Sequence, residues 1–530
     1  MTVADKILKL RKEKGLSQEA FAEQLGVSRQ SVSKWESGTA VPDTEKILAM
    51  SEIFGVSTDY LLKNEEAEVP VQNEERKEAF MDKKDIEVKT EKTKKKNPAL
   101  KIIAAVLALA LVVTCIAVPV HFGGFREAWW ELNGGKIQYP YVLVHGLGGW
   151  GDNDGINNSA QYWGSTTGDL KTYLTEQGYT VHAPSVGPVS SAWDRACELY
   201  AQLTGTQVDY GEAHSKEHGH ERFGEKFDTP LVENWGEKIN GGQRVKINLV
   251  GHSFGGATVR LFTSLLEYGS EAEKDATGEE TSPLFEGGKG NWVNSVTALC
   301  APHNGSSLTE IINDAGSILG VGDTTNLLVK LCFAIAGITD PVSGVYDFKL
   351  DHFGIGAVDG DENAINSVIS SFSKAGTDHA AYDLSPDGAA ELNETIKTVE
   401  DVYYFSYAYS TTREGSILKG QVPEKGTFAL LYPVALAMGS YKGTTEGGIE
   451  IDETWQANDG LVNVVSAKYP AGEEYLDFPE EEDAKFKRGI WYVAPVKSGH
   501  HGTVIGLGAD TEKTQEFFTE HFELVDALKR

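Results

Sequence analysis

A serine flanked by glycines follows an apolar segment near the middle of the chain. The residues Gly251-His252-Ser253-Phe254-Gly255 have the form G-x-S-x-G and come directly after the apolar run 245–250. Where a strand turns sharply into a helix and exposes a serine hydroxyl, side chains two positions before and after the serine would clash, so glycine is needed there. In a chain with 57 glycines such a motif can arise by chance, so the surrounding features must support it.

Three further features agree with a nucleophilic Ser253. His145-Gly146 follows the apolar run 141–144, Asp459 lies in QANDGLVN, and His500 and His501 lie in KSGHHG. The order Ser…Asp…His is that of an α/β-hydrolase, in which the serine attacks an ester carbonyl, a histidine takes its proton and the aspartate orients the imidazole. We expect the backbone N–H groups of Leu147 and Phe254 to stabilise the oxyanion. From the motif alone, Asp459 beside Gly460 could also be an ordinary turn, and only one of the two histidines can be the base.

The elements needed to position these residues are visible as alternating strands and helices. Short apolar runs predict strands at 141–144, 245–250, 296–302 and 402–407, and amphipathic stretches lie between them. Strands that alternate with helices indicate a mostly parallel sheet covered by helices on both faces. We therefore predict the α/β class, with an α/β-hydrolase domain over residues 122–530.

A long uncharged segment precedes this domain. Residues 102–120 contain no charged side chain, and a helix of that length spans the hydrocarbon core of a membrane. Lysines crowd the N-terminal flank, and positive charge is retained on the cytoplasmic side. We predict one transmembrane helix at 99–121 in a single-pass protein of the cell membrane, with residues 1–98 cytoplasmic and residues 122–530 outside.

Charge and composition separate the remaining parts. Residues 65–98 are dense in mixed charge and contain no glycine, which indicates a linker. The net charge of −30 belongs to residues 122–530, so it does not argue against nucleic-acid binding by residues 1–64, which are balanced in charge. The four cysteines are too few for a disulfide framework.

Residues 1–64 have the spacing of a small helical bundle. Apolar positions and serine caps predict helices that end near Gly15, cover QEAFAEQL and SRQSVSKWESG, and continue at about 43–53 and 57–62. The segment LSQEAFAEQLGVSRQSVSKWESGTAVP resembles the Cro/repressor type of helix-turn-helix, the XRE family. The resemblance implies DNA binding, usually as a dimer, through Gln18 on phosphate and through three residues on base edges, namely Arg29, Gln30 and Lys34. The competing interpretation is a helical bundle that binds protein.

The outer segment is similar to the zinc-binding bacterial triacylglycerol lipases of the thermoalkalophilic type. The similarity is carried by WDRACELYAQLTGTQVDYGEAHSKEHGHERFG, APHNG, YDLS and HHGTVIG. It selects His501 over His500 as the catalytic base. It also implies a structural zinc ion held by two aspartates and two histidines, namely Asp194, His214, His220 and Asp383, a set that suits closed tetrahedral coordination. The family's calcium positions near the catalytic histidine correspond to Thr503 and Gly508, which puts a calcium site in doubt.

Together these features predict a membrane-anchored serine ester hydrolase, a triacylglycerol lipase or carboxylesterase, with a DNA-binding head. Two alternatives remain. The outer domain of a membrane-tethered transcription regulator could sense lipids or esters without turnover, or the same fold could act as a phospholipase or short-chain esterase. The apolar stretch 308–338 is where a lid over the active site is expected to begin.

Overall fold

The computed structural model divides the chain into two compact units, Met1–Phe122 and Gly123–Arg530. It describes residues 3–56 with gaps at 15, 26, 28, 37–41, 43 and 55, and residues 138–528 with gaps at 159, 240–241, 320–346, 356–375, 417–418 and 480–484. No helix within these described ranges is long and apolar enough to cross a membrane. The predicted linker 65–98 and the predicted span 99–121 lie outside the described residues.

The described residues of the first unit form a small bundle of helices. They are α1 (Val3–Glu13), α2 (Gln18–Leu25), α3 (Arg29–Glu36) and α4 (Thr44–Phe54). The apolar face of each helix turns inward, and the buried core comprises Ile7, Leu10, Phe21, Ala22, Leu25, Val32, Trp35, Ile47, Met50 and Phe54. These helices confirm the predicted ones, and the further helix expected at 57–62 lies outside the described residues.

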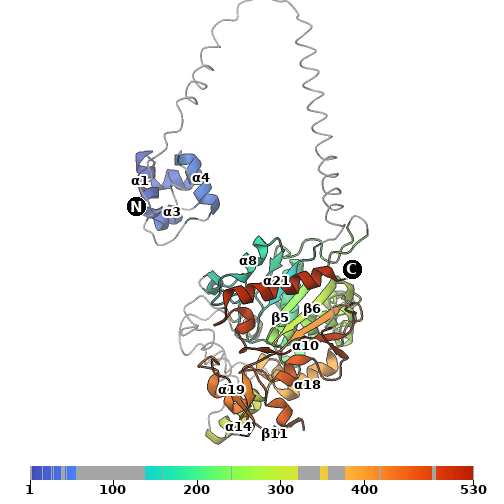
Figure 1. Cartoon of the computed structure of the whole chain (residues 1–530). Helices are drawn as coiled ribbons and strands as arrows, with labels where there is room; N and C mark the ends of the chain where they lie inside the picture. The colour runs from blue at the N-terminus through green and yellow to red at the C-terminus, as the bar shows by residue number, and fades with distance from the viewer. Residues whose placement is uncertain are drawn as a thin grey trace, which may run out of the picture. The chain divides into compact units, whose positions relative to one another are not determined.

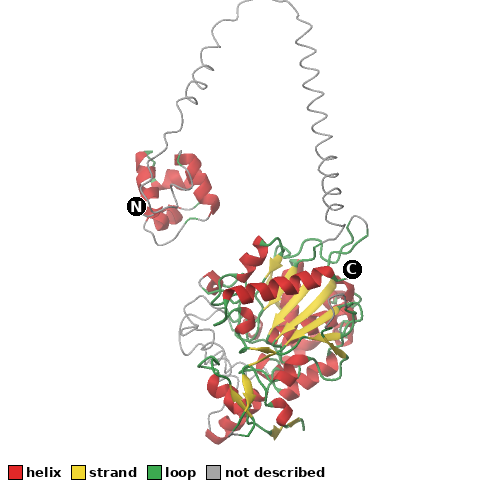
Figure 2. Ribbon diagram, in the orientation of Figure 1, coloured by secondary structure: helices red, strands yellow, loops and turns green. Residues whose placement is uncertain are grey.

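The second unit is built on a seven-stranded sheet (Figures 1 and 2). Its strand order is β13-β14-β7-β6-β5-β1-β2, and all neighbouring strands run parallel. The strands are β1 (Tyr141–Val144), β2 (Val181–His182), β5 (Ile247–His252), β6 (Val293–Leu299), β7 (Tyr403–Tyr407), β13 (Tyr475–Asp477) and β14 (Trp491–Val493). The four predicted strands are all present and β1, β5, β6 and β7 are adjacent, which confirms the parallel α/β architecture.

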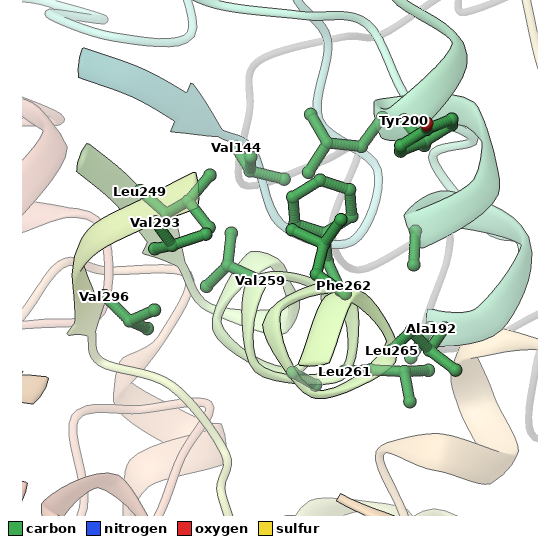
Figure 3. Close-up of a cluster of buried hydrophobic side chains, with 14 of the residues drawn as sticks. Val144, Ala192, Tyr200, Leu249, Val259, Leu261, Phe262, Leu265, Val293 and Val296 are labelled. Carbon is green, nitrogen blue, oxygen red and sulfur yellow. The ribbon is translucent and has the colours of Figure 1, made fainter. Parts of the chain in front are cut away.

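Helices cover both faces of this sheet. On one face, α9 (Ala192–Thr204) and α11 (Phe254–Tyr268) bury side chains against alternate strand residues such as Val144 and Leu249 (Figure 3). On the other face, α8 (Leu170–Glu176) packs beside α21 (Thr511–Ala527), which Figure 1 shows lying across β5 and β6. Every residue of β1, β5 and β6 is buried, as expected for strands that are covered on both faces. The strand β1 is wholly apolar, whereas β5 and β6 also carry buried polar side chains such as Asn248 and Thr297.

Shorter helices and two-stranded ladders complete the described part of this unit. The remaining helices are α10 (Glu212–His218), α12 (Glu271–Thr277), α13 (Pro283–Glu286), α14 (Ser307–Leu319), α17 (Ala380–Asp383), α18 (Pro386–Thr395), α19 (Tyr432–Met438) and α20 (Val464–Lys468). Two-stranded ladders pair β3 (Gln207–Asp209) with β4 (Phe223–Lys226), β8 (Tyr409–Ser410) with β15 (Lys497–Ser498), β9 (Thr412–Glu414) with β10 (Gln421–Pro423), and β11 (Gly443–Thr444) with β12 (Glu450–Ile451).

Candidate active site and metal centre

Ser253 lies at the sharp turn between β5 and α11. Its backbone has φ 55° and ψ −129°, a conformation that residues other than glycine rarely adopt. A Cβ atom added to Gly251 would lie 2.3 Å from the Gly255 carbonyl oxygen, and one added to Gly255 would lie 2.2 Å from the Val144 carbonyl oxygen. The two glycines of the motif are therefore required by close backbone contacts around the serine, as the sequence predicts.

The structure brings Asp459 and His501 together, although 42 positions separate them. The His501 Nδ1 lies 2.8 Å from the Asp459 Oδ2, and both side chains are buried. The other carboxylate oxygen accepts the backbone N–H groups of Leu461 and Val462, at 2.9 and 2.8 Å. The carboxylate is thus held from several sides and can orient the imidazole.

The second histidine of the pair faces elsewhere. The His500 ring stacks on Phe428 with a centroid separation of 5.4 Å, and its Nδ1 accepts the Gly502 N–H at 3.3 Å. The structure therefore pairs His501, and not His500, with the aspartate.

A mostly apolar pocket opens over Ser253. Its walls are formed by Leu147, Ser306, Leu308, Thr309, Leu384, Leu461 and Val462. Such a surface suits the acyl chain of an ester. Leu308 belongs to α14, the first part of the segment expected to form a lid, and residues 320–338 of that segment lie outside the described residues.

The two residues expected to form the oxyanion hole belong to two segments next to this serine. Phe254 is the first residue of α11, where backbone N–H groups have no partner within the helix. Leu147 lies in the loop after β1 and lines the same pocket as Ser253. The N–H of Ser253 itself donates to the Leu299 carbonyl at 2.8 Å, so it is not available to bind an oxyanion.

A second cluster of ionisable side chains lies around α9 and α10. Asp194, His214, His220 and Asp378 offer ligand atoms that all lie within 4.8 Å of one another. The His214 Nε2 is 3.3 Å from Asp194 Oδ1 and 3.4 Å from Asp378 Oδ1, and the His220 Nε2 is 3.3 Å from Asp378 Oδ2. These five atoms are buried and have no hydrogen-bond partner within the described structure. Buried polar atoms that converge without partners fit a bound cation.

One predicted ligand, Asp383, lies outside this cluster. Its Oδ2 accepts the Ala192 N–H at 2.7 Å, at the first turn of α9, and burial raises its pKa to about 8. The fourth position of the cluster is taken by Asp378, five residues earlier in the chain. Asp378 lies just before the short helix α17 and Asp383 is the last residue of that helix, so their side chains meet different partners. The signal for Asp378 is the same TDHAAYDLS segment, whose two acidic residues the sequence does not distinguish.

His352 is a further residue that the sequence reasoning missed. Its Nε2 lies 3.0 Å from the Asp194 Oδ2, on the side of that carboxylate away from His214. A hydrogen bond of this kind orients a ligand carboxylate. The two positions that correspond to the family's calcium site are Thr503 and Gly508, and neither has a carboxylate. The Thr503 hydroxyl accepts the His500 N–H, and the nearby Asp510 caps the first turn of α21.

In the helical head, the residues expected to contact DNA lie on α2 and α3. Gln18 donates through its amide to Glu36 at 2.8 Å, and Arg11 donates to the same carboxylate at 3.0 Å. Lys34 is exposed in the last turn of α3. Arg29 and Gln30 open that helix, and their side chains lie outside the described structure.

The parallel sheet, the strained serine turn and the His–Asp pair define an α/β domain of the kind that presents a nucleophile at a strand end. Comparison with known proteins agrees. Residues 137–530 match the family model described as lipase-like, C-terminal domain, and residues 7–61 match a helix-turn-helix model. The chain therefore belongs to the family of lipase-like C-terminal domains and carries a helix-turn-helix domain at its N-terminal end.

Individual relatives support this assignment. The chain is similar to Lipase 2 of Staphylococcus aureus, with 33% identity over 378 residues, which cover 70% of this chain and 50% of that protein. It thus spans half the length of this relative. The solved structure of EstA from Clostridium botulinum has 34% identity and a TM-score of 0.65, and covers 74% of this chain and 88% of that one. Lipase 1 from Pelosinus fermentans has 36% identity and a TM-score of 0.63, with coverage of 74% and 100%.

Proposed function

We propose that residues 122–530 hydrolyse carboxylic esters through a catalytic triad of Ser253, His501 and Asp459. The observation that carries this proposal is the strained Ser253 turn under an apolar pocket, together with the 2.8 Å contact between His501 and Asp459. The lipase names of its relatives support the same reaction class.

The proposed reaction has two halves. The Ser253 Oγ attacks the ester carbonyl carbon while His501 Nε2 takes the hydroxyl proton, and Asp459 stabilises the resulting imidazolium. The N–H groups of Leu147 and Phe254 bind the developing oxyanion. The C–O bond then breaks, His501 protonates the leaving alkoxide, and an acyl-serine remains. Water activated by His501 hydrolyses this intermediate and returns the free serine.

The apolar lining of the pocket favours acylglycerols over small polar esters as substrates. The test is a substrate panel with the purified protein: p-nitrophenyl esters from acetate to palmitate, a triacylglycerol emulsion and phospholipid vesicles. Turnover of long acyl esters and of triacylglycerol supports a lipase. Turnover confined to short esters or to phospholipid would favour the alternatives on the same fold, and no turnover of any ester would favour a lipid-sensing domain.

We further propose that the cluster of Asp194, His214, His220 and Asp378 holds a structural zinc ion. Two imidazoles and two carboxylates are ligands that zinc accepts in a closed tetrahedral site. When bound, the ion would supply a cross-link rather than chemistry at the ester. It would tie α9 and the segment around α10 to the chain before α17, and so stabilise this side of the domain.

We also propose that the helix-turn-helix head binds DNA through α3. Replacing Arg29 by alanine should weaken binding of residues 1–64 to a selected DNA site by about tenfold or more, because an arginine pairing with a guanine edge contributes about 1–3 kcal/mol. Selection from a random DNA pool, followed by titration in a gel-shift assay, measures this. Failure to enrich any sequence would contradict the proposal, and a matched Lys12→Ala variant, on the exposed part of α1, is the control.

Finally, we propose that residues 99–121 anchor the protein in the cell membrane, with the lipase-like domain outside. The uncharged run and its lysine flank support this. The expected result is that the full chain sediments with membranes and resists extraction by alkaline carbonate, because a spanning helix is held by the hydrocarbon core. A chain lacking residues 99–121 should be released. Protease added outside intact spheroplasts should cut residues 122–530 and spare residues 1–64; the reverse pattern would contradict the orientation.

A further inference from the structure

In the loop after β1, at the candidate oxyanion hole, one backbone N–H group makes no hydrogen bond within the described structure. Three of the four backbone N–H groups in residues 146–149 donate to the Tyr162 hydroxyl, the Pro188 carbonyl and the Gly146 carbonyl, at 2.8, 2.8 and 3.1 Å. Among these described residues, only the Leu147 N–H has no hydrogen-bond partner. It is therefore free to bind an oxyanion, provided that its peptide group faces the right way.

Two groups hold the carbonyl that sets this orientation: the Gly149 N–H, at 3.1 Å, and a neighbouring imidazole, at the shorter distance. The Gly146 carbonyl and the Leu147 N–H belong to one planar trans peptide and point in opposite directions, so holding the carbonyl also holds the N–H. The His145 Nδ1 lies 2.9 Å from this carbonyl oxygen, and its Nε2 lies 3.2 Å from the Val186 N–H. An N–H can only donate and a carbonyl can only accept, so the ring is neutral with its proton on Nδ1. His145 thus donates a hydrogen bond to the Gly146 carbonyl.

The surroundings keep the ring of His145 neutral and in place. Burial, followed by the charge of Arg195, lowers the pKa of His145 well below its usual value. The same arginine donates to the His145 carbonyl and so holds the main chain at this residue. The ring packs closely against Gly149, where an added Cβ atom would lie 2.6 Å from Nδ1.

A second set of hydrogen bonds fixes the loop from its other side. The Tyr162 hydroxyl accepts the Gly146 N–H and lies 2.6 Å from His252 Nδ1, while His252 Nε2 lies 3.1 Å from the His501 carbonyl. Since that carbonyl can only accept, His252 carries its proton on Nε2, and the tyrosine donates to Nδ1. The oxyanion loop and the loop of the catalytic histidine are therefore joined through Tyr162 and His252.

We propose that His145 is a positioning residue for ester hydrolysis: its Nδ1–H holds the 146–147 peptide so that the Leu147 N–H faces the oxyanion formed at Ser253. If this peptide flipped, the Gly146 carbonyl would point toward the oxyanion and repel it. The inference rests on the proposed hydrolase function and adds to it the residue, His145, that holds the oxyanion hole in its binding conformation.

Two substitutions of similar size test this role in the full-length protein. Asparagine places an amide nitrogen near the position of His145 Nδ1, whereas glutamine places it nearer the position of Nε2. His145→Asn should keep kcat for p-nitrophenyl butyrate within about fivefold of the wild type. His145→Gln should lower kcat by about 10²-fold, the effect of losing one oxyanion donor, with KM changed less than threefold. Affinity for an alkylboronic acid, which forms a tetrahedral adduct on the serine, should fall in parallel with kcat.

Each other outcome has a defined meaning. Equal kcat and equal boronate affinity in His145→Gln and the wild type would overturn the inference, as would equal losses in both variants. A wild-type protein that hydrolyses no ester would instead overturn the proposed function. A measurement without substitution is available if a variant does not fold: ¹⁵N imidazole NMR of the wild type should show His145 neutral with its proton on Nδ1, and a proton on Nε2 would overturn the inference.

Discussion

Replacing Ser253 by alanine should lower kcat/KM for ester hydrolysis by about 10⁴-fold or more, the scale seen when a triad nucleophile is removed. The substitution deletes the attacking oxygen and leaves the pocket and oxyanion donors in place, so substrate should still bind. Initial rates on p-nitrophenyl butyrate measure the loss of turnover, and binding of an unreactive ether analogue of the ester, which forms no bond to the serine, measures whether the pocket still holds its ligand. Turnover that survives in Ser253→Ala would show that another group attacks the ester.

The neighbouring histidines provide the matched control for this mechanism. His501→Asn should reduce kcat nearly as far as Ser253→Ala, because its imidazole is the one within 2.8 Å of Asp459. His500→Asn removes the same kind of ring one residue earlier and should retain activity within about tenfold. If the two variants lose activity equally, the assignment of the base to His501 is wrong.

The second large effect concerns the proposed metal centre. Asp378→Asn should lose most of its bound zinc, whereas Asp383→Asn should keep it, because only Asp378 meets His214 and His220. At free zinc a thousand times above Kd, bound metal contributes about 4 kcal/mol to the free energy of unfolding. Removal of metal by a chelator should therefore lower the unfolding temperature of the wild type, and should not change that of Asp378→Asn.

Elemental analysis after dialysis and a thermal unfolding scan provide the two readouts. Asp383→Asn serves as the matched control, since it alters an acidic residue that caps α9 rather than one in the cluster. The assignment is contradicted if Asp378→Asn retains a full equivalent of zinc. A wild-type protein that contains no zinc and is equally heat-stable with and without chelator would contradict the metal site as a whole.

The local features of this chain were readable without a structure. Apolar runs of four to seven residues gave the positions of β1, β5, β6 and β7, because strands buried on both faces need such runs. The two glycines around Ser253 were predictable for a similar reason, since their requirement arises from backbone atoms a few residues away or on the next strand. The helices of the head likewise follow from caps and apolar spacing within single segments.

The hydrogen-bond and ion-pair partners of individual polar side chains could not be predicted from local sequence patterns. Asp378 and Asp383 lie in one short segment and have the same chemistry, yet one meets two histidines and the other caps α9. The contact of His352 with Asp194 joins residues 158 positions apart, and no sequence motif predicts that these two side chains meet.

The sequence by itself thus determined the class of the domain and the serine turn, because these depend on steric and apolar patterns within short segments, and its resemblance to known lipases selected His501 as the base of the proposed triad. Only the tertiary structure decided which aspartate joins the proposed metal cluster and which way the peptide after Gly146 faces. Those outcomes depend on where hydrogen-bonding atoms from separate elements meet, and that is set by the packing of helices and loops around the whole sheet.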